Sequence, residues 1–212
     1  MAQKSLKRDP IIPLSGNDWE HVYEPAEDTF LFMDALEKEL DDIKSASPGL
    51  IFELGCGSGC VSAFLATNLP GPAYIASDIN PHAIDAARRT FTANQLHVDL
   101  LNMDLFSAFH FPSGIDVLLF NPPYVPTPHE EIESSWIARS WAGGEKGREV
   151  VDKVLEKIET ILSPQGRLYM VALDSNDPHE IAKWMGTKGY RTKVVIRRKA
   201  GIENLLILKI FK

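Results

Sequence analysis

Residues 121–124, Asn-Pro-Pro-Tyr, directly follow an apolar run at 115–120. The run predicts a buried strand, and the prolines end it because neither has a backbone N–H for a sheet. Each proline also favours an extended conformation in the residue before it, which makes a stiff corner. There the Asn121 amide and the Pro122 carbonyl can accept two hydrogen bonds from one planar nitrogen group lying against Tyr124. Because α/β sheets bind ligands at the carboxyl ends of their strands, the corner predicts a site for a planar nitrogen.

Three alternating glycines, Gly55, Gly57 and Gly59, lie between a predicted strand and a predicted helix. Glycine lets the backbone approach a ligand closely, so this pattern predicts a nucleotide or nucleoside cradle. A dinucleotide fold prefers Gly-x-Gly-x-x-Gly, with a pyrophosphate at the helix N-terminus. Here the spacing is Gly-x-Gly-x-Gly, and the preceding Glu53 would repel a pyrophosphate but suit the amino group of a methionine-derived cofactor. The charge argument favours S-adenosylmethionine over NAD.

Two acidic residues follow the second and third predicted strands. Asp78 can accept hydrogen bonds from two ribose hydroxyls, as acidic residues at this position do in nucleotide-binding folds. Asp104 can accept a bond from an adenine amino group, with Leu105 and Phe106 beside the ring. Both carboxylates also fit a structural role as helix caps. The sequence leaves these interpretations open.

The remaining candidates near the corner each have two interpretations. We interpret Tyr124 as stacking on the acceptor, with packing under the loop as the alternative. His129 is the nearest candidate base, but no histidine need act as a base, and we expect it to be a solvent-facing loop residue. Trp136 and Trp141 fit a substrate channel and core packing equally well.

Acidic residues and cysteines near these motifs have simpler explanations. We expect Glu130, Glu131 and Glu133 to lie in a solvated loop, with attraction of basic peptide segments as the alternative. Cys56 and Cys60 suit small core fillers, because two cysteines without further ligands make a poor metal site. We therefore predict no metal site.

The composition predicts one soluble domain over residues 1–212, with an irregular lead-in at 1–22. Hydrophobic residues make up 44% of the chain and the net charge is −7, which argues against bulk phosphate binding. We find no apolar run of membrane-spanning length and no apolar signal-peptide core. With two closely spaced cysteines, a disulfide framework is implausible. We expect a cytoplasmic or nuclear protein.

Strands and helices alternate along the rest of the chain. Strands are predicted at 50–54, 73–77, 98–101, 115–120, 166–173, 193–198 and 205–211, and helices at 23–40, 61–69, 81–94, 145–162 and 178–188. The first helix carries an apolar stripe made of Phe30, Leu31, Met33, Leu36 and Leu40. Residues 125–144 are predicted as a long loop. This alternation predicts a mostly parallel sheet with helices on both faces, and the two closing strands, with no helix between them, must be antiparallel.

The combined motifs resemble those of class I S-adenosylmethionine-dependent methyltransferases that act on planar nitrogens. The stretches at 22–30, 141–149 and 201–209 narrow this resemblance to the eukaryotic and archaeal release-factor glutamine methyltransferases, the HemK-like catalytic subunits. The resemblance implies a Rossmann-like fold with seven strands in the order 3-2-1-4-5-7-6. It also implies that one set of residues lines the cofactor or reaction site: Thr29, Glu53, Gly55, Asp78, Asp104, Leu105 and Asn121.

The resemblance further implies N5-methylation of the glutamine in the Gly-Gly-Gln loop of the class-1 release factor. Lysine methylation, including that of histone H4, is ascribed to the same family. A small zinc-binding activator subunit is the implied partner. In a sheet that begins 3-2-1, the strand from Val98 to Leu101 lies at an edge, and its apolar residues invite pairing with another chain. We expect the activator to bind there.

Two other functions compete with this one. A nucleic-acid adenine-N6 methyltransferase would use the same Asn-Pro-Pro-Tyr corner, but the acidic net charge and the short chain disfavour it. A non-catalytic scaffolding subunit would have no use for the corner. Methyl transfer to release factor, histone and DNA, measured side by side, would separate the three.

Overall fold

The strands form one sheet in the order β3-β2-β1-β4-β5-β7-β6. The structure is a computed structural model that describes residues 8–107, 114–132, 135–201 and 203–212. The strands are β1 (Leu50–Leu54), β2 (Ala73–Asp78), β3 (Asp99–Asn102), β4 (Ile115–Phe120), β5 (Leu162–Leu173), β6 (Arg191–Ala200) and β7 (Glu203–Phe211). The first five pair in parallel, whereas β7 pairs antiparallel with both β5 and β6. The predicted strand order and the antiparallel closure are confirmed.

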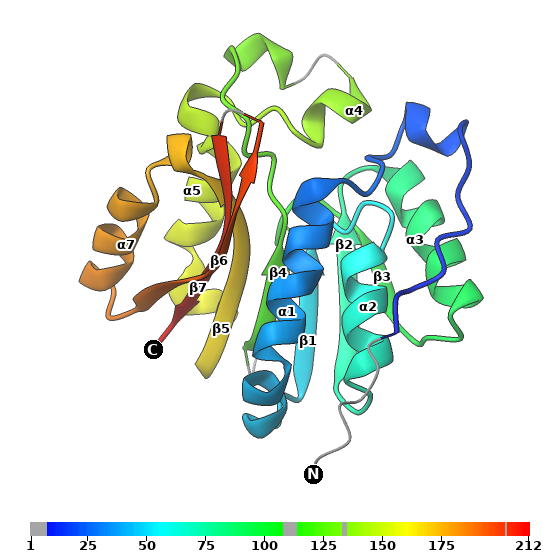
Figure 1. Cartoon of the computed structure of the whole chain (residues 1–212), viewed down its shortest axis with the longest axis horizontal. Helices are drawn as coiled ribbons and strands as arrows, with labels where there is room; N and C mark the ends of the chain where they lie inside the picture. The colour runs from blue at the N-terminus through cyan, green and yellow to red at the C-terminus, as the bar shows by residue number, and fades with distance from the viewer. Residues whose placement is uncertain (1–7, 108–113, 133–134, 202) are drawn as a thin grey trace.

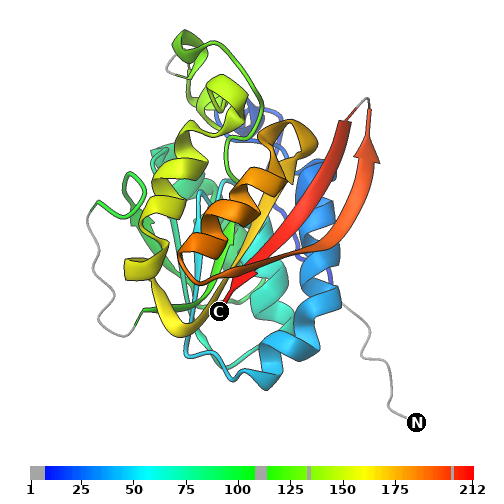
Figure 2. The ribbon, with the colours of Figure 1, turned by 90° about the vertical axis from the view of Figure 1, so that its left-hand side faces the viewer.

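Helices cover both faces of the sheet (Figures 1 and 2). They are α1 (Glu27–Ser45), α2 (Cys60–Asn68), α3 (Pro81–Ala93), α4 (Trp136–Arg139), α5 (Glu149–Glu156), α6 (Ile158–Ile161) and α7 (Pro178–Thr187). Alternate side chains of each central strand point to opposite faces. In β4, Leu119 therefore packs with α1 and α2, whereas Leu118 packs with α5, α6 and α7.

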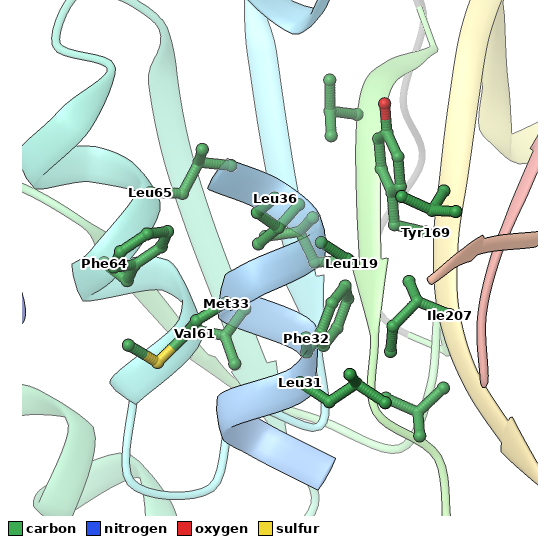
Figure 3. Packing of buried hydrophobic residues seen from close by; sticks show 14 of the residues in the cluster. Leu31, Phe32, Met33, Leu36, Val61, Phe64, Leu65, Leu119, Tyr169 and Ile207 are labelled. Atoms are coloured by element: carbon green, nitrogen blue, oxygen red, sulfur yellow. The ribbon is translucent and has the colours of Figure 1, made fainter. Parts of the chain in front are cut away.

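The larger core lies between α1, α2 and the sheet. Figure 3 shows Leu36 of α1 beside Leu119 of β4 and Tyr169 of β5, all with no measurable exposure. Burying a large apolar side chain stabilises the fold by about 1.5–3 kcal/mol. Phe30, a member of the predicted apolar stripe of α1, is 49% exposed, so the stripe is not buried along its whole length. The helix turns Phe30 away from the sheet, whereas Leu31 and Phe32 are fully buried.

The segment 125–144 is not a structureless loop, which corrects the prediction. It contains a 3-10 turn at His129–Glu131 and the short helix α4. The Ser135 hydroxyl caps α4 by accepting from the Ala138 backbone N–H at 3.1 Å. In Figure 1, α4 lies beyond the carboxyl ends of the parallel strands.

The single helix predicted at 145–162 is also wrong. A 3-10 turn at Glu145–Gly147, then α5 and α6, replace it, and β5 already begins at Leu162. Lys146 has a φ of +57° and Gly147 one of +66°, so the chain cannot be helical there. A Cβ at Gly147 would lie 1.9 Å from the Tyr124 carbonyl oxygen. The helical pattern fails because this segment packs directly on the backbone after the corner.

The described part of the lead-in, residues 8–22, is irregular except for a 3-10 turn at Asp18–Glu20. It is tied to the helices through hydrogen bonds such as the one from the Ile11 backbone N–H to Asn94 Oδ1 at 2.8 Å. None of the helices in the described ranges combines the length and the apolar character needed to cross a membrane.

Candidate active site

A cavity of about 310 Å³ lies where β1, β2 and β4 end, between the start of α1 and the segment carrying α4. The structure brings together in its wall every residue that the family resemblance assigned to the site: Thr29, Glu53, Gly55, Asp78, Asp104, Leu105 and Asn121. Gly57 lies there too. Gly59, Pro122 and Tyr124 are not among the lining residues.

The glycine loop joins β1 to α2 with its backbone against the cavity. The backbone N–H groups of Gly55 and Cys56 both donate to the Ser77 carbonyl, at 2.8 and 2.9 Å, and so fix the loop to the end of β2. At Gly57, where φ is +51°, a Cβ would meet nothing within 4 Å. Gly59 serves packing instead, because a Cβ there would lie 3.0 Å from the Phe91 ring of α3. The loop therefore leaves open space for a ligand at Gly57, and at Gly59 it allows close packing against α3.

Glu53 places a carboxylate in the wall while being 2% exposed. The Ser62 backbone N–H, in the first turn of α2, donates to Glu53 Oε2 at 3.0 Å. Burial raises the pKa of Glu53 to about 8 despite this bond, and the nearby Asp78 charge adds to the increase. Within the described residues, no Lys, Arg or His forms an ion pair with it. A cationic ligand group would restore the ionised carboxylate.

Asp78 is held by the backbone on both carboxylate oxygens. Oδ2 accepts from the Gly57 N–H and Oδ1 from the Asn80 N–H, each at 2.9 Å. Burial raises the pKa of Asp78 in spite of these bonds. Asn80 is the N-cap of α3, accepting from the His82 N–H at 3.0 Å, so Asp78 is not the cap. Each Asp78 oxygen keeps a lone pair for a ligand hydroxyl.

Asp104 and Leu105 lie on the turn after β3, and both line the cavity. Asp104 is exposed, and Leu105 has a φ of +47°. A turn rather than a helix follows Asp104 in the described residues. The helix-cap interpretation therefore has no support from this part of the chain.

Asn121 offers a buried acceptor to the cavity. Its Nδ2 donates to Asp28 Oδ2 at 2.9 Å. Its Oδ1 is buried and has no hydrogen-bond partner among the described residues. A buried acceptor without a partner costs about 1–3 kcal/mol, so its presence in a cavity wall marks a place for a donor. Sequence reasoning missed Asp28, because α1 and the corner are distant in the chain and only the fold joins them.

The side chains of Pro122 and Tyr124 pack against the protein interior and support the corner. Pro122 is buried, and the half-buried Tyr124 packs against the core under α1 and α2. This favours packing over stacking for the Tyr124 ring. The Tyr124 carbonyl accepts from Asn176 Nδ2 at 2.8 Å, and the same amide donates to the Lys146 carbonyl at 2.9 Å. Asn176, 1% exposed, is a second supporting residue that no sequence signal identified.

The segment around α4 forms the outer wall. Trp136 and Arg139 line the cavity, with the Arg139 guanidinium carbon 5.4 Å from the centre of the Trp136 ring. Trp141 is half-buried and not among the lining residues. His129 is solvent-facing, as predicted, and its Nδ1 lies 3.0 Å from Glu149 Oε2.

The other acidic and sulfur-bearing candidates play no evident part in the wall chemistry. Glu130 is exposed and Glu131 half-buried, whereas Glu133 lies outside the described residues. Cys56 and Cys60 are buried free thiols, and burial raises the pKa of both. They are therefore poor nucleophiles at neutral pH.

Comparisons with known proteins agree with this geometry. The chain matches the methyltransferase small domain family over residues 28–139. Methyltransferase HEMK2 of Homo sapiens is 43% identical over 194 residues, covering 90% of this chain and 90% of its own length. The eRF1 methyltransferase catalytic subunit mtq2 of Schizosaccharomyces pombe is 38% identical over 210 residues, covering 92% and 91%.

A solved structure is similar over the same extent. A chain of the E. cuniculi Mtq2–Trm112 complex, described as responsible for methylation of the eRF1 translation termination factor, matches with a TM-score of 0.70 and 28% identity. The match covers 91% of this chain and 99% of that one. The family match spans more than half of the chain and includes the Asp28 and Asn121 corner. The chain therefore belongs to the methyltransferase small domain family, in the group that includes human methyltransferase HEMK2.

Proposed function

We propose that this chain is the catalytic subunit of an S-adenosylmethionine-dependent protein methyltransferase. Its proposed acceptor is N5 of the glutamine in the Gly-Gly-Gln loop of the class-1 translation release factor. The observation that carries this proposal is Asn121 Oδ1, a buried acceptor without a partner among the described residues, in a wall shared with the Glu53 and Asp78 carboxylates. Similarity to the S. pombe and E. cuniculi eRF1 methyltransferases supports the choice of acceptor.

The residues present fit the proposed cofactor. Glu53 would pair with its amino group, and the free lone pairs of Asp78 would accept from its ribose hydroxyls. The open space at Gly57 allows close approach, and Asp104 and Leu105 would hold the adenine. When bound, S-adenosylmethionine would supply a methyl group attached to a positively charged sulfur. This sulfur is a good leaving group, because it becomes a neutral thioether when the methyl group is transferred.

The corner would activate the acceptor by orientation. A carboxamide nitrogen is a poor nucleophile because its lone pair is delocalised into the carbonyl. Asn121 Oδ1 and the Pro122 carbonyl would accept its two N–H bonds, hold the nitrogen and concentrate electron density on it. As the N–C bond to the methyl group forms, the nitrogen releases one of its two protons to water, because neither acceptor group takes up a proton. His129 has no proposed role in the step.

We also propose that a small zinc-binding activator subunit pairs with β3. Among the described strands, β3 is an edge strand whose neighbour is β2. The Met103 N–H donates to the Asp78 carbonyl on the β2 side at 3.1 Å, so by alternation the Leu100 N–H points outward. Leu100 and Leu101 are half-buried at this edge. A strand added there would use the outward backbone groups.

This interface can be tested on the Leu100 backbone. Leu100→Pro removes the outward N–H while sparing the β2 ladder, and Leu100→Ala controls for lost side-chain packing. We expect the proline variant to lose co-purification with the activator and the alanine variant to keep most of it. Equal retention by both would contradict pairing at β3.

The acceptor proposal is tested by transfer of a labelled methyl group to three substrates in parallel. We expect label on the release factor at glutamine, with histone H4 as a secondary substrate to be measured. DNA labelling above the release-factor level would favour the adenine-N6 alternative. We propose that this protein is cytoplasmic, where it would meet the release factor. If it also methylates histone H4, we propose that part of it is nuclear.

A further inference from the structure

We infer that Asp28 is a positioning residue that determines which end of the Asn121 amide faces the acceptor; the inference rests on the proposed function of Asn121. An asparagine amide has nearly the same shape at both ends but opposite hydrogen-bonding character. Only the oxygen end can accept a substrate N–H. Some neighbouring group must therefore select the orientation.

Asp28 has the geometry for this selection. It lies in the first turn of α1, is 3% exposed, and accepts from Asn121 Nδ2 at 2.9 Å through Oδ2. An ionised carboxylate can only accept, so it pairs with the NH₂ end of Asn121 and repels the oxygen end. This leaves Asn121 Oδ1 as the atom without a partner among the described residues.

The other contacts of Asp28 hold its carboxylate as a hydrogen-bond acceptor. Its Oδ1 accepts from the Thr29 backbone N–H at 2.8 Å and from the Tyr23 hydroxyl at 3.1 Å. The Thr29 N–H has no lone pair to offer, so this side of Asp28 must remain an acceptor. Burial, followed by the Asp28 charge, raises the pKa of Tyr23, so its hydroxyl stays protonated and remains a donor.

These bonds form a directional chain from α1 to the corner. The Thr29 N–H and the Tyr23 hydroxyl donate to Asp28, and Asn121 Nδ2 donates to Asp28 from the other side. Rotating the Asn121 amide by half a turn would break its bond and oppose two oxygens. It would also aim NH₂ at the donor groups of the acceptor amide. The first turn of α1 thereby specifies an acceptor at the corner.

The decisive variant is Asp28→Asn, which preserves size. Its carbonyl oxygen must stay on the Thr29 N–H, so its NH₂ group faces Asn121 and forces that amide to turn. We expect kcat for methyl transfer to fall about 100-fold, as for loss of one preorganised hydrogen bond at a reacting group. Cofactor affinity and melting temperature should stay near wild type. Wild-type kcat in D28N would overturn the inference.

A second change should repair the first. In the double variant D28N with Asn121→Asp, the new NH₂ group donates to the new carboxylate, whose second oxygen again faces the acceptor. We expect kcat at least tenfold above that of D28N. A purely structural role for Asp28 predicts no such recovery, so a double variant no better than D28N would overturn the inference.

A measurement without substrate separates this inference from the proposed function. In the ¹⁵N spectrum of the full chain, the Asn121 NH₂ protons should shift in D28N, because the hydrogen bond to a carboxylate is lost. The matched control is Asp41→Asn, an exposed position on the same helix, which should leave that signal and kcat unchanged. An unshifted Asn121 signal in D28N would overturn the inference, whichever substrate the enzyme methylates.

Discussion

Two groups of polar side chains lie near opposite ends of α1, and their hydrogen bonding differs. The cavity cluster comprises Asp28, Glu53, Asp78 and Asn121, and the lysine cluster comprises Glu39, Asp42 and Lys209. From the rise per residue, Asp28 and Asp42 lie about 21 Å apart along α1. Figure 1 shows this helix running along the sheet from one end to the other.

Each carboxylate of the lysine cluster is paired with Lys209, and Asp42 also pairs with Arg167. Lys209 Nζ lies 2.6 Å from both Glu39 Oε2 and Asp42 Oδ2, and the Tyr169 hydroxyl donates to Glu39 at 3.2 Å. Burial alone would raise the pKa of Glu39, but Lys209 and the more distant Lys193 outweigh burial and lower it. The hydrogen bond from Lys209 also lowers the pKa of Asp42.

In the cavity cluster, by contrast, the carboxylates are not paired with cations of the described residues. The Glu53 and Asp78 carboxylates have raised pKa values and, within the described residues, no cation paired to them. Asn121 keeps an acceptor without a partner there. The comparison teaches that the lysine cluster stabilises the fold by itself, whereas the cavity cluster costs stability that a cationic ligand and a donor substrate can offset.

The largest expected effect is on chemistry at the corner. Asn121→Ala removes the acceptor that would hold the substrate nitrogen, so we expect methyl transfer to fall by about 1000-fold or more. Cofactor affinity, measured by calorimetry, should change little because Glu53 and Asp78 remain. Retained turnover would contradict the assignment of Asn121.

The next effect concerns stability in the lysine cluster. Lys209→Met leaves the buried Glu39 with only the exposed Lys193 as a lysine partner, so we expect the free energy of unfolding to fall by about 3–5 kcal/mol in urea titrations. The added change Glu39→Gln removes the stranded charge and should recover part of that loss. A single variant as stable as wild type would show that the cluster contributes nothing.

In the cavity cluster, removing a buried charge is expected to raise stability. Burial raises the pKa of Glu53 from 4.5 to about 8, so the folded state binds more protons over that window and stability falls as pH rises through it. Glu53→Gln keeps an acceptor for the Ser62 N–H, should raise the melting temperature above pH 8, and should weaken cofactor binding about tenfold or more. A variant that melts lower than wild type at that pH would contradict the comparison.

The smallest effect tests how burial controls an ion pair. Lys193 Nζ lies 3.3 Å from Glu39 Oε1, but its side chain is 56% exposed. We expect Lys193→Ala to lower the free energy of unfolding by less than about 1 kcal/mol, and less again in high salt. A loss as large as that of Lys209→Met would mean that both lysines neutralise Glu39 equally.

The predictions from sequence succeeded where the cause was local. The prolines after Asn121 end β4, and Gly55 and Gly57 after β1 form the cradle, because each restricts or frees its own backbone. Periodicity found the strands and most helices. It failed at 145–147, where a helical pattern yields to close packing on Tyr124, and it could not show that the fold leaves Phe30 exposed. That the whole chain forms one domain remains a prediction.

The sequence by itself determined the strands, the glycine cradle and the corner, because these follow from backbone preferences over a few neighbouring residues. Only the tertiary structure decided which groups face one another. Asp28 meets Asn121 across 93 positions of the chain, and Lys209 meets Glu39 across 170. No local preference encodes such pairs, since they depend on how α1 packs across the finished sheet. The tertiary structure therefore decides the orientation of the Asn121 amide and the placement of the unpaired carboxylates at the cavity.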